Sequence, residues 1–561
     1  MKLTGAQIIV ECLLEQGVDT VFGYPGGSVL NIYDALYEYQ DQINHILTAH
    51  EQGASHAADG YARSTGKTGV VIATSGPGAT NLVTGLATAY MDSVPMVAIT
   101  GNVALPLLGL DSFQEVDITG VTMPITKHNY IVKRVEDLAP ILREAFFIAG
   151  SGRKGPVLVD IPKDITAAVW EYERTAPQTI APDCRATDAE LDLAVQMIQE
   201  SARPFVYSGG GVSASQGGQQ ALARFVELVD TPVSSSLMGQ GSFDNTDPRY
   251  IGMLGMHGTK VSSIAVGECD LFIGVGTRFS DRVICNIKTF APQAKVLQID
   301  IDPAEINKNI KVSHKLIGDA ALVLQKLCGR LSPASHPEWM ERMDACKREY
   351  PLIQVPADEE AVTPQYVIET LDELTNGEAI ISTEVGQHQM WAAQFYNFKH
   401  PRQFVSSGGL GTMGYGLGAS LGAQVGNPDK LVINIAGDGS FHMNCNELVT
   451  ASKYNIPIVE LLFNNNVLGM VRQWQRLFYG KRFSQTTLDR ATDYVKLAEA
   501  FGLAGYTITK KSQVRDVLKK ALETPAPVLV NCVIDKDINV LPMVPAGASV
   551  AEPILEIEID D

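Results

Sequence analysis

The chain alternates short, apolar, β-branched runs with longer segments whose apolar residues recur at helical spacing. Runs such as Gly69–Ala73 and Leu271–Val275 are apolar throughout, as in parallel strands buried on both faces. Segments such as Ala6–Glu15 and Ala79–Tyr90 have the period of helices between such strands. This alternation predicts an α/β protein with doubly wound, mostly parallel sheets. Further strands are expected at Val21–Gly23, Ile43–Ala49, Met96–Thr100, Val157–Ile161, Phe205–Ser208, Pro232–Ser235, Val296–Ile301, Ala379–Thr383, Leu431–Ala436, Ile458–Phe463 and Pro527–Ile534.

Two polar, proline-containing stretches divide this pattern into three blocks. The first covers residues 168–188, and the second begins at Leu331 and closes near residue 363. We therefore expect domains over residues 1–167, 189–335 and 364–540, followed by a tail over 541–561. No period of about 20–50 residues recurs, which argues against a solenoid. Ligands of open α/β sheets bind beyond the carboxyl ends of the strands, so motifs at strand ends carry the most weight.

Composition excludes several classes of function. The 561 residues have a formal net charge of −19, which disfavours nucleic acid and anionic membranes as partners. The eight cysteines are scattered without a CxxC pair, which favours reduced thiols over a disulfide or zinc scaffold. The sequence shows neither a signal-peptide pattern nor an apolar run of membrane-spanning length. These features predict a cytoplasmic protein.

The sharpest chemical signal lies in the third block. One expected strand ends in Gly437-Asp438-Gly439 and the next ends in Asn464-Asn465, with the 24 residues 440–463 between them. This spacing fits one crossover between neighbouring strands, so Asp438 and Asn465 can meet at one sheet edge. Their oxygen atoms suit Mg²⁺ held together with phosphate, and the glycines let the backbone approach a diphosphate. Either turn alone is more simply a solvated loop, and it is the pairing that favours a metal site.

These paired motifs resemble the thiamine-diphosphate signature, and almost the whole chain resembles the large, catalytic subunit of the acetohydroxyacid (acetolactate) synthases. The resemblance implies an N-terminal pyrimidine-binding domain, a central FAD-binding domain and a C-terminal domain for the diphosphate and Mg²⁺. It also implies that pyruvate is decarboxylated and its hydroxyethyl unit transferred to pyruvate or 2-ketobutyrate, the first common step of branched-chain amino-acid biosynthesis. The implied partners are these 2-keto acids, a second copy in a homodimer or dimer of dimers, and a small regulatory subunit.

The family's cofactor positions carry over residue by residue. The resemblance implies that Asp438, Asn465 and the backbone carbonyl of Val467 bind Mg²⁺. Met413 matches the apolar residue that holds the two rings of the cofactor bent, although a lone methionine is usually core filler. The other thiamine-diphosphate positions are Glu51, Val385, Gly386, Gln387, His388, Gly411, Gly437, Gly439 and Ser440.

Glu51 follows an expected strand of the first block. One reading is a glutamate that starts a helix and is favoured there by the helix dipole. The family motif instead gives Glu51 the exchange of a proton with the aminopyrimidine of the cofactor. A zinc protease motif is excluded, because HEQGASH lacks a second histidine four residues after the first. The other positions implied at the reacting centre are Gly27, Phe113, Gln114, Lys163, Arg282, Met470 and Trp474.

The second block places glycine, aspartate and arginine after several expected strands. Single glycine clusters of this kind are weak evidence for a nucleotide, and the resemblance is what implies FAD. One position departs from the family, where the segment usually reads RFDDR: here it is RFSDR, with Ser280 in place of an acid. The implied FAD positions are Arg153, Gly210, Gly211, Met256, His257, Gly276, Arg278, Arg282, Asp300 and Asp319.

Other functions share parts of this pattern. An FAD-dependent enzyme like pyruvate oxidase would have the same GDG and NN pair, but the segment around Trp474 matches the carboligating branch. A P-loop is suggested by Gly66-Lys67-Thr68, yet five residues instead of four separate Gly60 from Gly66. A non-catalytic flavoprotein would leave Glu51 and the Asp438 motif without a role.

Overall fold

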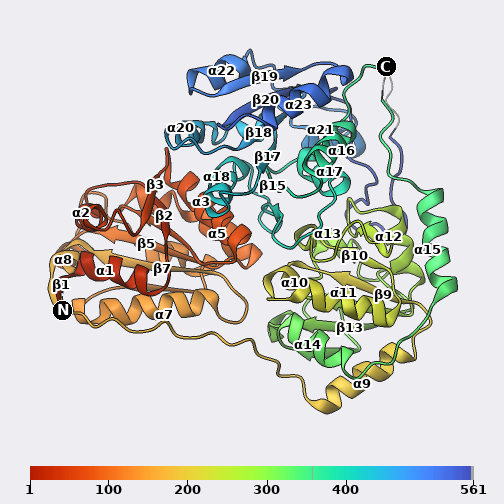
Figure 1. Ribbon diagram of the computed structural model, residues 1–561, viewed down its shortest axis with the longest axis horizontal. Helices are drawn as coiled ribbons and strands as arrows, with labels where there is room; N and C mark the ends of the chain where they lie inside the picture. Colours follow the sequence, from red (N-terminus) through yellow and green to blue (C-terminus); the bar gives the residue numbers. More distant parts are fainter. Residues whose placement is uncertain (357, 558–561) are drawn as a thin grey trace.

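The computed structural model describes residues 1–356 and 358–557. Its described part contains three six-stranded, entirely parallel sheets, each covered by helices (Figure 1). This confirms the expected α/β class with doubly wound sheets. We call the three parts the first unit (β2–β7), the second unit (β9–β14) and the third unit (β15–β20).

The first and third units share one strand order. The first sheet runs β3 (Asn44–Leu47), β2 (Thr20–Gly23), β4 (Gly69–Ala73), β5 (Met96–Asn102), β7 (Pro156–Pro162) and β6 (His128–Ile131). The third runs β16 (Phe404–Val405), β15 (Ile380–Thr383), β17 (Val432–Gly437), β18 (Val459–Asn464), β20 (Val528–Val533) and β19 (Ala504–Ile508). In both, the order reverses between the first and third strands of the unit, where such sheets bind ligands.

The second unit has a different order. It runs β11 (Tyr250–Met253), β10 (Val233–Ser235), β9 (Pro204–Ser208), β12 (Leu271–Val275), β13 (Lys295–Asp300) and β14 (His314–Ile317). Numbered within the unit, this is 3-2-1-4-5-6, the order of dinucleotide-binding sheets, and it reverses between β9 and β12.

Helices cover both faces of each sheet. Those of the first unit are α1 (Gly5–Glu15), α2 (Leu30–Glu38), α3 (Glu51–Thr65), α4 (Pro77–Thr80), α5 (Val83–Asp92), α6 (Ile118–Thr122), α7 (Leu138–Gly150) and α8 (Lys163–Ala167). The second unit carries α9 (Asp188–Gln199), α10 (Gly210–Ala214), α11 (Gly218–Val229), α12 (Lys260–Glu268), α13 (Asp281–Ile284) and α14 (Ala320–Cys328), with α15 (Pro337–Glu349) beyond it. The third carries α16 (Pro364–Thr375), α17 (Gln387–Phe395), α18 (Gly416–Gly426), α19 (Asp438–Phe441), α20 (Leu448–Lys453), α21 (Gly469–Phe478), α22 (Tyr494–Ala500) and α23 (Val514–Leu522).

The first and third units are joined by the packing of α3 against α18. Two glycines allow these helices to approach closely. A β-carbon at Gly60 would lie 2.0 Å from the Ala419 carbonyl oxygen, and one at Gly422 would lie 1.8 Å from that of Ala57. The loops at the carboxyl ends of β3 and β17 are thereby brought to the same side of the molecule.

Three sequence expectations differ from the structure. The single helix expected over Ala79–Tyr90 is two helices, α4 and α5, interrupted at Asn81, whose side chain turns to Glu51. The linker expected from residue 168 begins as a strand, β8 (Val169–Glu171), because it pairs with β1 (Lys2–Thr4). The polar stretch after residue 331 contains helix α15, which buries Trp339 against the second unit.

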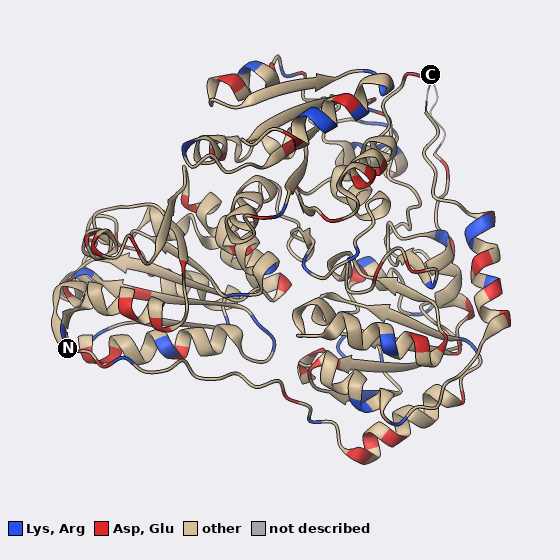
Figure 2. Ribbon diagram, viewed as in Figure 1, with Lys and Arg blue, Asp and Glu red and all other residues tan. Residues whose placement is uncertain are grey.

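The surface and the tail complete the fold. Acidic and basic residues are interspersed along outer helices such as α15 (Figure 2). The segment after residue 540 returns to the second unit, where the backbone nitrogen of Val544 donates to the Met256 carbonyl oxygen at 2.8 Å. No helix within the described residues is long and apolar enough to cross a membrane.

Candidate functional site

A small cavity of about 70 Å³ lies at the carboxyl ends of β15 and β17, where the strand order of the third sheet reverses. The adjacent parallel strands β17 and β18 place the GDG and NN motifs at one edge, as their spacing predicts. Of the residues expected for the diphosphate and its metal, those lining this cavity are Val385, Gly386, Gln387, His388, Met413, Gly437, Asp438, Gly439, Ser440, Asn465 and Val467, joined by Met470. Gly411 lines a second, larger cavity instead.

The small cavity contains polar atoms without a protein partner. Asp438 Oδ2, Gln387 Oε1 and His388 Nε2 are buried and accept or donate no hydrogen bond within the described structure. Burial raises the pKa of Asp438 to about 6 and lowers that of His388 to about 3. Free carboxylate and amide oxygens beside two glycines fit a hard cation that is bound together with a diphosphate.

The expected residues of the first unit lie apart from this cavity. Gly27 follows β2, Glu51 begins α3, Phe113 and Gln114 follow β5, and Lys163 begins α8 after β7. All five lie beyond the carboxyl ends of one parallel sheet, yet none lines the small cavity or the larger one. Within the described residues, Glu51 and Asp438 thus do not line a common wall of either of these two cavities.

Two residues that hold Glu51 were not expected from the sequence. Asn81 donates a hydrogen bond from Nδ2 to Glu51 Oε2 at 3.0 Å. Glu447 of the third unit is fully buried and accepts hydrogen bonds from the backbone nitrogens of Ala49 and His50 at 3.1 and 3.0 Å. Glu447 stands nine positions after Asp438, but an isolated glutamate before a helix gives no signal of a contact with another unit.

A large cavity of about 1470 Å³ lies where the three units meet. It opens at the carboxyl ends of β9 and β12, where the order of the second sheet reverses. Gly211 and Gly276 pack closely there, since a β-carbon at Gly211 would lie 2.7 Å from the α-carbon of Gly276. All ten positions expected for FAD line this cavity: Arg153, Gly210, Gly211, Met256, His257, Gly276, Arg278, Arg282, Asp300 and Asp319.

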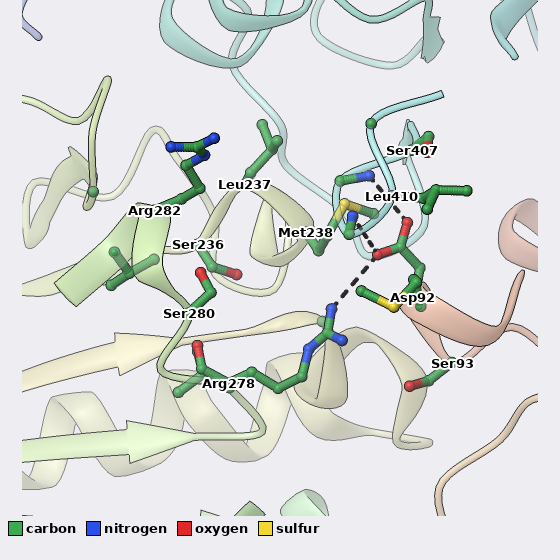
Figure 3. A pocket seen from close by; sticks show the side chains of 18 of the residues that line it. Asp92, Ser93, Ser236, Leu237, Met238, Arg278, Ser280, Arg282, Ser407 and Leu410 are labelled. Atoms are coloured by element: carbon green, nitrogen blue, oxygen red, sulfur yellow. Dashed lines mark hydrogen bonds and ion pairs between the residues drawn. The ribbon is translucent and has the colours of Figure 1, made fainter. Parts of the chain in front are cut away.

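The walls of the large cavity also carry unsatisfied polar atoms. Tyr207 Oη, Ser213 Oγ and His257 Nδ1 are buried without a hydrogen-bond partner in the described part of the chain. Burial raises the pKa of Asp300 to about 6. Ser280, which replaces the usual acid, lines the same wall (Figure 3). A polar, elongated ligand fits such walls better than a purely apolar one.

Asp92 connects the three units at the edge of the large cavity. Its carboxylate accepts hydrogen bonds from Arg63 Nη2 at 3.0 Å and from the backbone nitrogens of Gly408 and Gly409 at 3.0 and 2.8 Å. Arg278 Nη2 of the second unit lies 3.6 Å from Asp92 Oδ1 (Figure 3). No motif around Asp92 predicts this role from the sequence alone.

Arg282 and Trp474 face each other across the large cavity. The guanidinium carbon of Arg282 lies 5.9 Å from the centre of the Trp474 ring, within the range of a cation–π contact. Met470, one turn before Trp474 on α21, lines both cavities. The two cavities are thus neighbours, and a cation and an aromatic ring stand close to their junction.

Comparison with known proteins identifies the family. Family models match the thiamine pyrophosphate enzyme N-terminal TPP binding domain over residues 3–121, the central domain over 191–327 and the C-terminal TPP binding domain over 384–532. The chain is 45% identical to the acetolactate synthase large subunit of Pyropia yezoensis, over 98% of this chain and 95% of that protein. The acetolactate synthase isozyme 2 large subunit of Escherichia coli is 47% identical, over 98% of this chain and 99% of that protein. The chloroplastic acetolactate synthase 1 of Zea mays is also 47% identical, over 98% of this chain and 89% of that protein.

The chain belongs to the family of acetolactate synthase large subunits. Membership agrees with the resemblance seen in the sequence and makes the chain a thiamine-diphosphate enzyme of the transferase type. The catalytic and cofactor-binding roles of single residues stay predictions, although the structure gathers those of the second and third units around the two cavities.

Proposed function

We propose that the chain decarboxylates pyruvate and transfers the resulting hydroxyethyl unit to a second 2-keto acid. With pyruvate as acceptor the product is 2-acetolactate, and with 2-ketobutyrate it is 2-aceto-2-hydroxybutyrate, the first common step of branched-chain amino-acid biosynthesis. The observation that carries this proposal is the small cavity at the reversal point of the third sheet, with its unsatisfied Asp438 and Gln387 oxygens. The family membership supplies the chemistry that such a site supports.

The small cavity would hold the diphosphate and Mg²⁺. Asp438, Asn465 and the Val467 carbonyl would bind the metal, while Gly386 and Gly437 would lie beside the phosphate groups. When bound, thiamine diphosphate supplies a carbanion-stabilising centre for the decarboxylation. Burial of Asp438 would keep bulk water from competing for the cation.

Glu51 would exchange a proton with the aminopyrimidine of the cofactor. Asn81 donates to one of its oxygens and Glu447 holds the backbone just before it, so the carboxylate is fixed in direction. Because Glu51 lines neither the small nor the large cavity described above, we propose that it serves the small cavity of a second copy. Each site of a homodimer would then contain Glu51 of one protomer and Asp438 of the other.

Arg282 would bind the carboxylate of the acceptor keto acid. A guanidinium can hold a carboxylate by two parallel hydrogen bonds, and no carboxylate except exposed Asp281, at 3.8 Å, forms an ion pair with Arg282 in the described structure. Trp474 would provide the apolar wall for the acceptor's alkyl group. The acceptor must be in place before water protonates the two-carbon unit, or acetaldehyde would be released instead.

The large cavity would hold FAD. The supporting observation is that the second sheet has the 3-2-1-4-5-6 order, with glycines Gly211 and Gly276 at its reversal point. Arg278 and Arg153 would face the phosphate groups of FAD. Asp300 and Asp319 would face its ribose and adenine. In the family this flavin has a structural role. By analogy with the family, we further propose that the chain binds a small regulatory subunit and lies in the cytoplasm.

A product assay tests the proposal directly. Pyruvate is supplied to the purified chain with thiamine diphosphate, Mg²⁺ or FAD omitted in turn, and acetolactate, acetaldehyde and acetate are measured. Acetolactate that depends on thiamine diphosphate and Mg²⁺ is the expected result. Acetate formed with reduction of the flavin would favour the pyruvate oxidase alternative, and absorbance near 450 nm reports bound flavin independently.

A further inference from the structure

The large cavity contains both paired and unpaired cations. Arg153 lies 2.6 Å from Glu305, Lys308 lies 2.9 Å from Glu305, and Arg63 lies 3.0 Å from Asp92. Two other lining cations, Lys154 and Arg402, have no carboxylate within 4.0 Å among the described residues. Unlike Arg153, Lys308 and Arg63, neither forms an ion pair with a described carboxylate.

The environment of Arg402 is polar but not acidic. Its Nη1 donates a hydrogen bond to the Arg63 carbonyl oxygen at 3.1 Å, and no other side-chain hydrogen bond of Arg402 is formed in the described structure. A β-carbon at Gly66 would lie 3.0 Å from the guanidinium carbon, so this glycine leaves the space in which the guanidinium lies. The remaining N–H groups of Arg402 are available to a ligand.

Lys154 adds a second cation from another loop. It lies between α7 and β7 and makes no side-chain hydrogen bond in the described part of the chain. Burial lowers the pKa of its ammonium, and the positive charge of Arg402 lowers it further, whereas Asp319 acts in the opposite direction. Burial also lowers the pKa of the Arg402 guanidinium. Two partly buried cations that repel each other are costly to the folded protein unless an anion neutralises them.

We propose that Lys154 and Arg402 form an anion subsite that receives a phosphate group of the nucleotide in the large cavity. Lys154 lies within electrostatic reach of Asp319, a residue of the second unit at the end of the proposed flavin site. Arg402 comes from the third unit, so the bound phosphate ties the second and third units to the first. This subsite rests on the proposal that the cavity holds FAD, and extends it to two residues that no nucleotide motif contains.

Calorimetric binding to the flavin-free, full-length chain tests the subsite with three probes. FAD and ADP carry the diphosphate, and riboflavin carries none. Lys154→Met and Arg402→Met should each weaken FAD and ADP binding about 10-fold or more, because each removes a charged hydrogen bond to phosphate. Riboflavin binding should change less than 2-fold. Lys154→Arg should restore most of the affinity lost in Lys154→Met.

Lys308→Met is the matched control. Lys308 lines the same cavity but is already neutralised by Glu305, so its loss should change FAD affinity by less than about 3-fold. Melting temperatures of all variants are measured to exclude a general loss of structure.

The outcomes separate the subsite from the flavin. Unchanged FAD and ADP affinities in both methionine variants would overturn the subsite, as would an equal loss for riboflavin. If wild type binds ADP in a Lys154-dependent manner but not FAD, the subsite stands and the flavin proposal fails. If wild type binds neither FAD nor ADP, both fail.

Discussion

Glu447 Oε1 lies 3.0 Å from the backbone nitrogen of His50, the residue before Glu51. Its other oxygen accepts a hydrogen bond from the Ala49 nitrogen. Burial raises the pKa of Glu447, and the Thr450 hydroxyl and these backbone groups act against that rise. A residue of the third unit therefore fixes the backbone directly before Glu51, which begins α3.

Replacing Glu447 should impair the reaction without a large effect on pyruvate binding. Glu447→Gln keeps the shape but replaces one acceptor with a donor, which leaves a buried backbone N–H unsatisfied, at a cost of ~1–3 kcal/mol. We expect kcat to fall at least 10-fold with KM nearly constant. Glu499→Gln, on the exposed face of α22, serves as control. A variant with wild-type kcat would show that the Glu51 loop needs no support from Glu447.

Mixing two inactive variants should restore activity if the site is shared between two copies. Glu51→Ala and Asp438→Ala each remove one half of the proposed site, and a mixed dimer contains one intact pair. After subunit exchange, we expect activity up to about half that of wild type per mixed dimer. Mass spectrometry of differently tagged chains must show that mixed dimers have formed. Continued inactivity of such dimers would contradict a site composed of both protomers.

The contact between Arg282 and Trp474 predicts separate effects on acceptor choice. Trp474→Leu should lose preference for 2-ketobutyrate, because one methylene in an apolar pocket is worth ~1–3 kcal/mol. Arg282→Lys should slow carboligation more than decarboxylation, because an ammonium cannot form the two parallel hydrogen bonds of a guanidinium. Product ratios under competition between pyruvate and 2-ketobutyrate measure both effects. Wild-type product ratios in both variants would show that Arg282 and Trp474 do not form the acceptor site.

Buried Glu384 should make the stability of the folded protein depend on pH. Burial raises its pKa from 4.5 to about 7, while the backbone nitrogens of Leu417 and Gly414 favour the carboxylate. The folded state thus holds this proton more tightly than the unfolded chain. Protonated Glu384 therefore adds to the free energy of unfolding. This contribution is complete below pH about 4.5 and is lost as the pH rises through about 7.

Glu384→Gln should remove this dependence. The difference in stability between wild type and variant should change by ~1–3 kcal/mol between pH 5 and pH 8, with wild type losing stability relative to the variant as the pH rises. Thermal unfolding at a series of pH values measures it, with Glu369→Gln on the exposed face of α16 as control. Parallel curves for wild type and Glu384→Gln would contradict a raised pKa.

The sequence predicted the inner strands of each sheet better than the outer ones. The five strands of the three large sheets that were not expected, β6, β11, β14, β16 and β19, all lie at sheet edges. Central strands such as β4 and β12 are buried on both faces and read as continuous apolar runs. Most of these edge strands are partly exposed, so their composition resembles that of loops.

For the site, local motifs could be predicted and contacts between units could not. Asp438 and Asn465 are linked by one crossover, so their spacing predicts their meeting. Asp92 and Glu447 act across units that are hundreds of residues apart in the chain. Only the packing of α3 on α18 and the cavity between the units decide those contacts, and neither leaves a pattern in a single sequence.

The interactions of Asp92 couple the three units to one another. The buried Asp92 carboxylate accepts hydrogen bonds from the first and third units and lies 3.6 Å from Arg278 of the second unit, so widening the large cavity would separate this charge from its partners. Opening for ligand exchange should therefore be an all-or-none event instead of a gradual spreading. Calorimetry should show one cooperative melting transition, and Asp92→Asn should split it into separate transitions of the individual units. A single, unchanged transition in that variant would show that the units are coupled elsewhere.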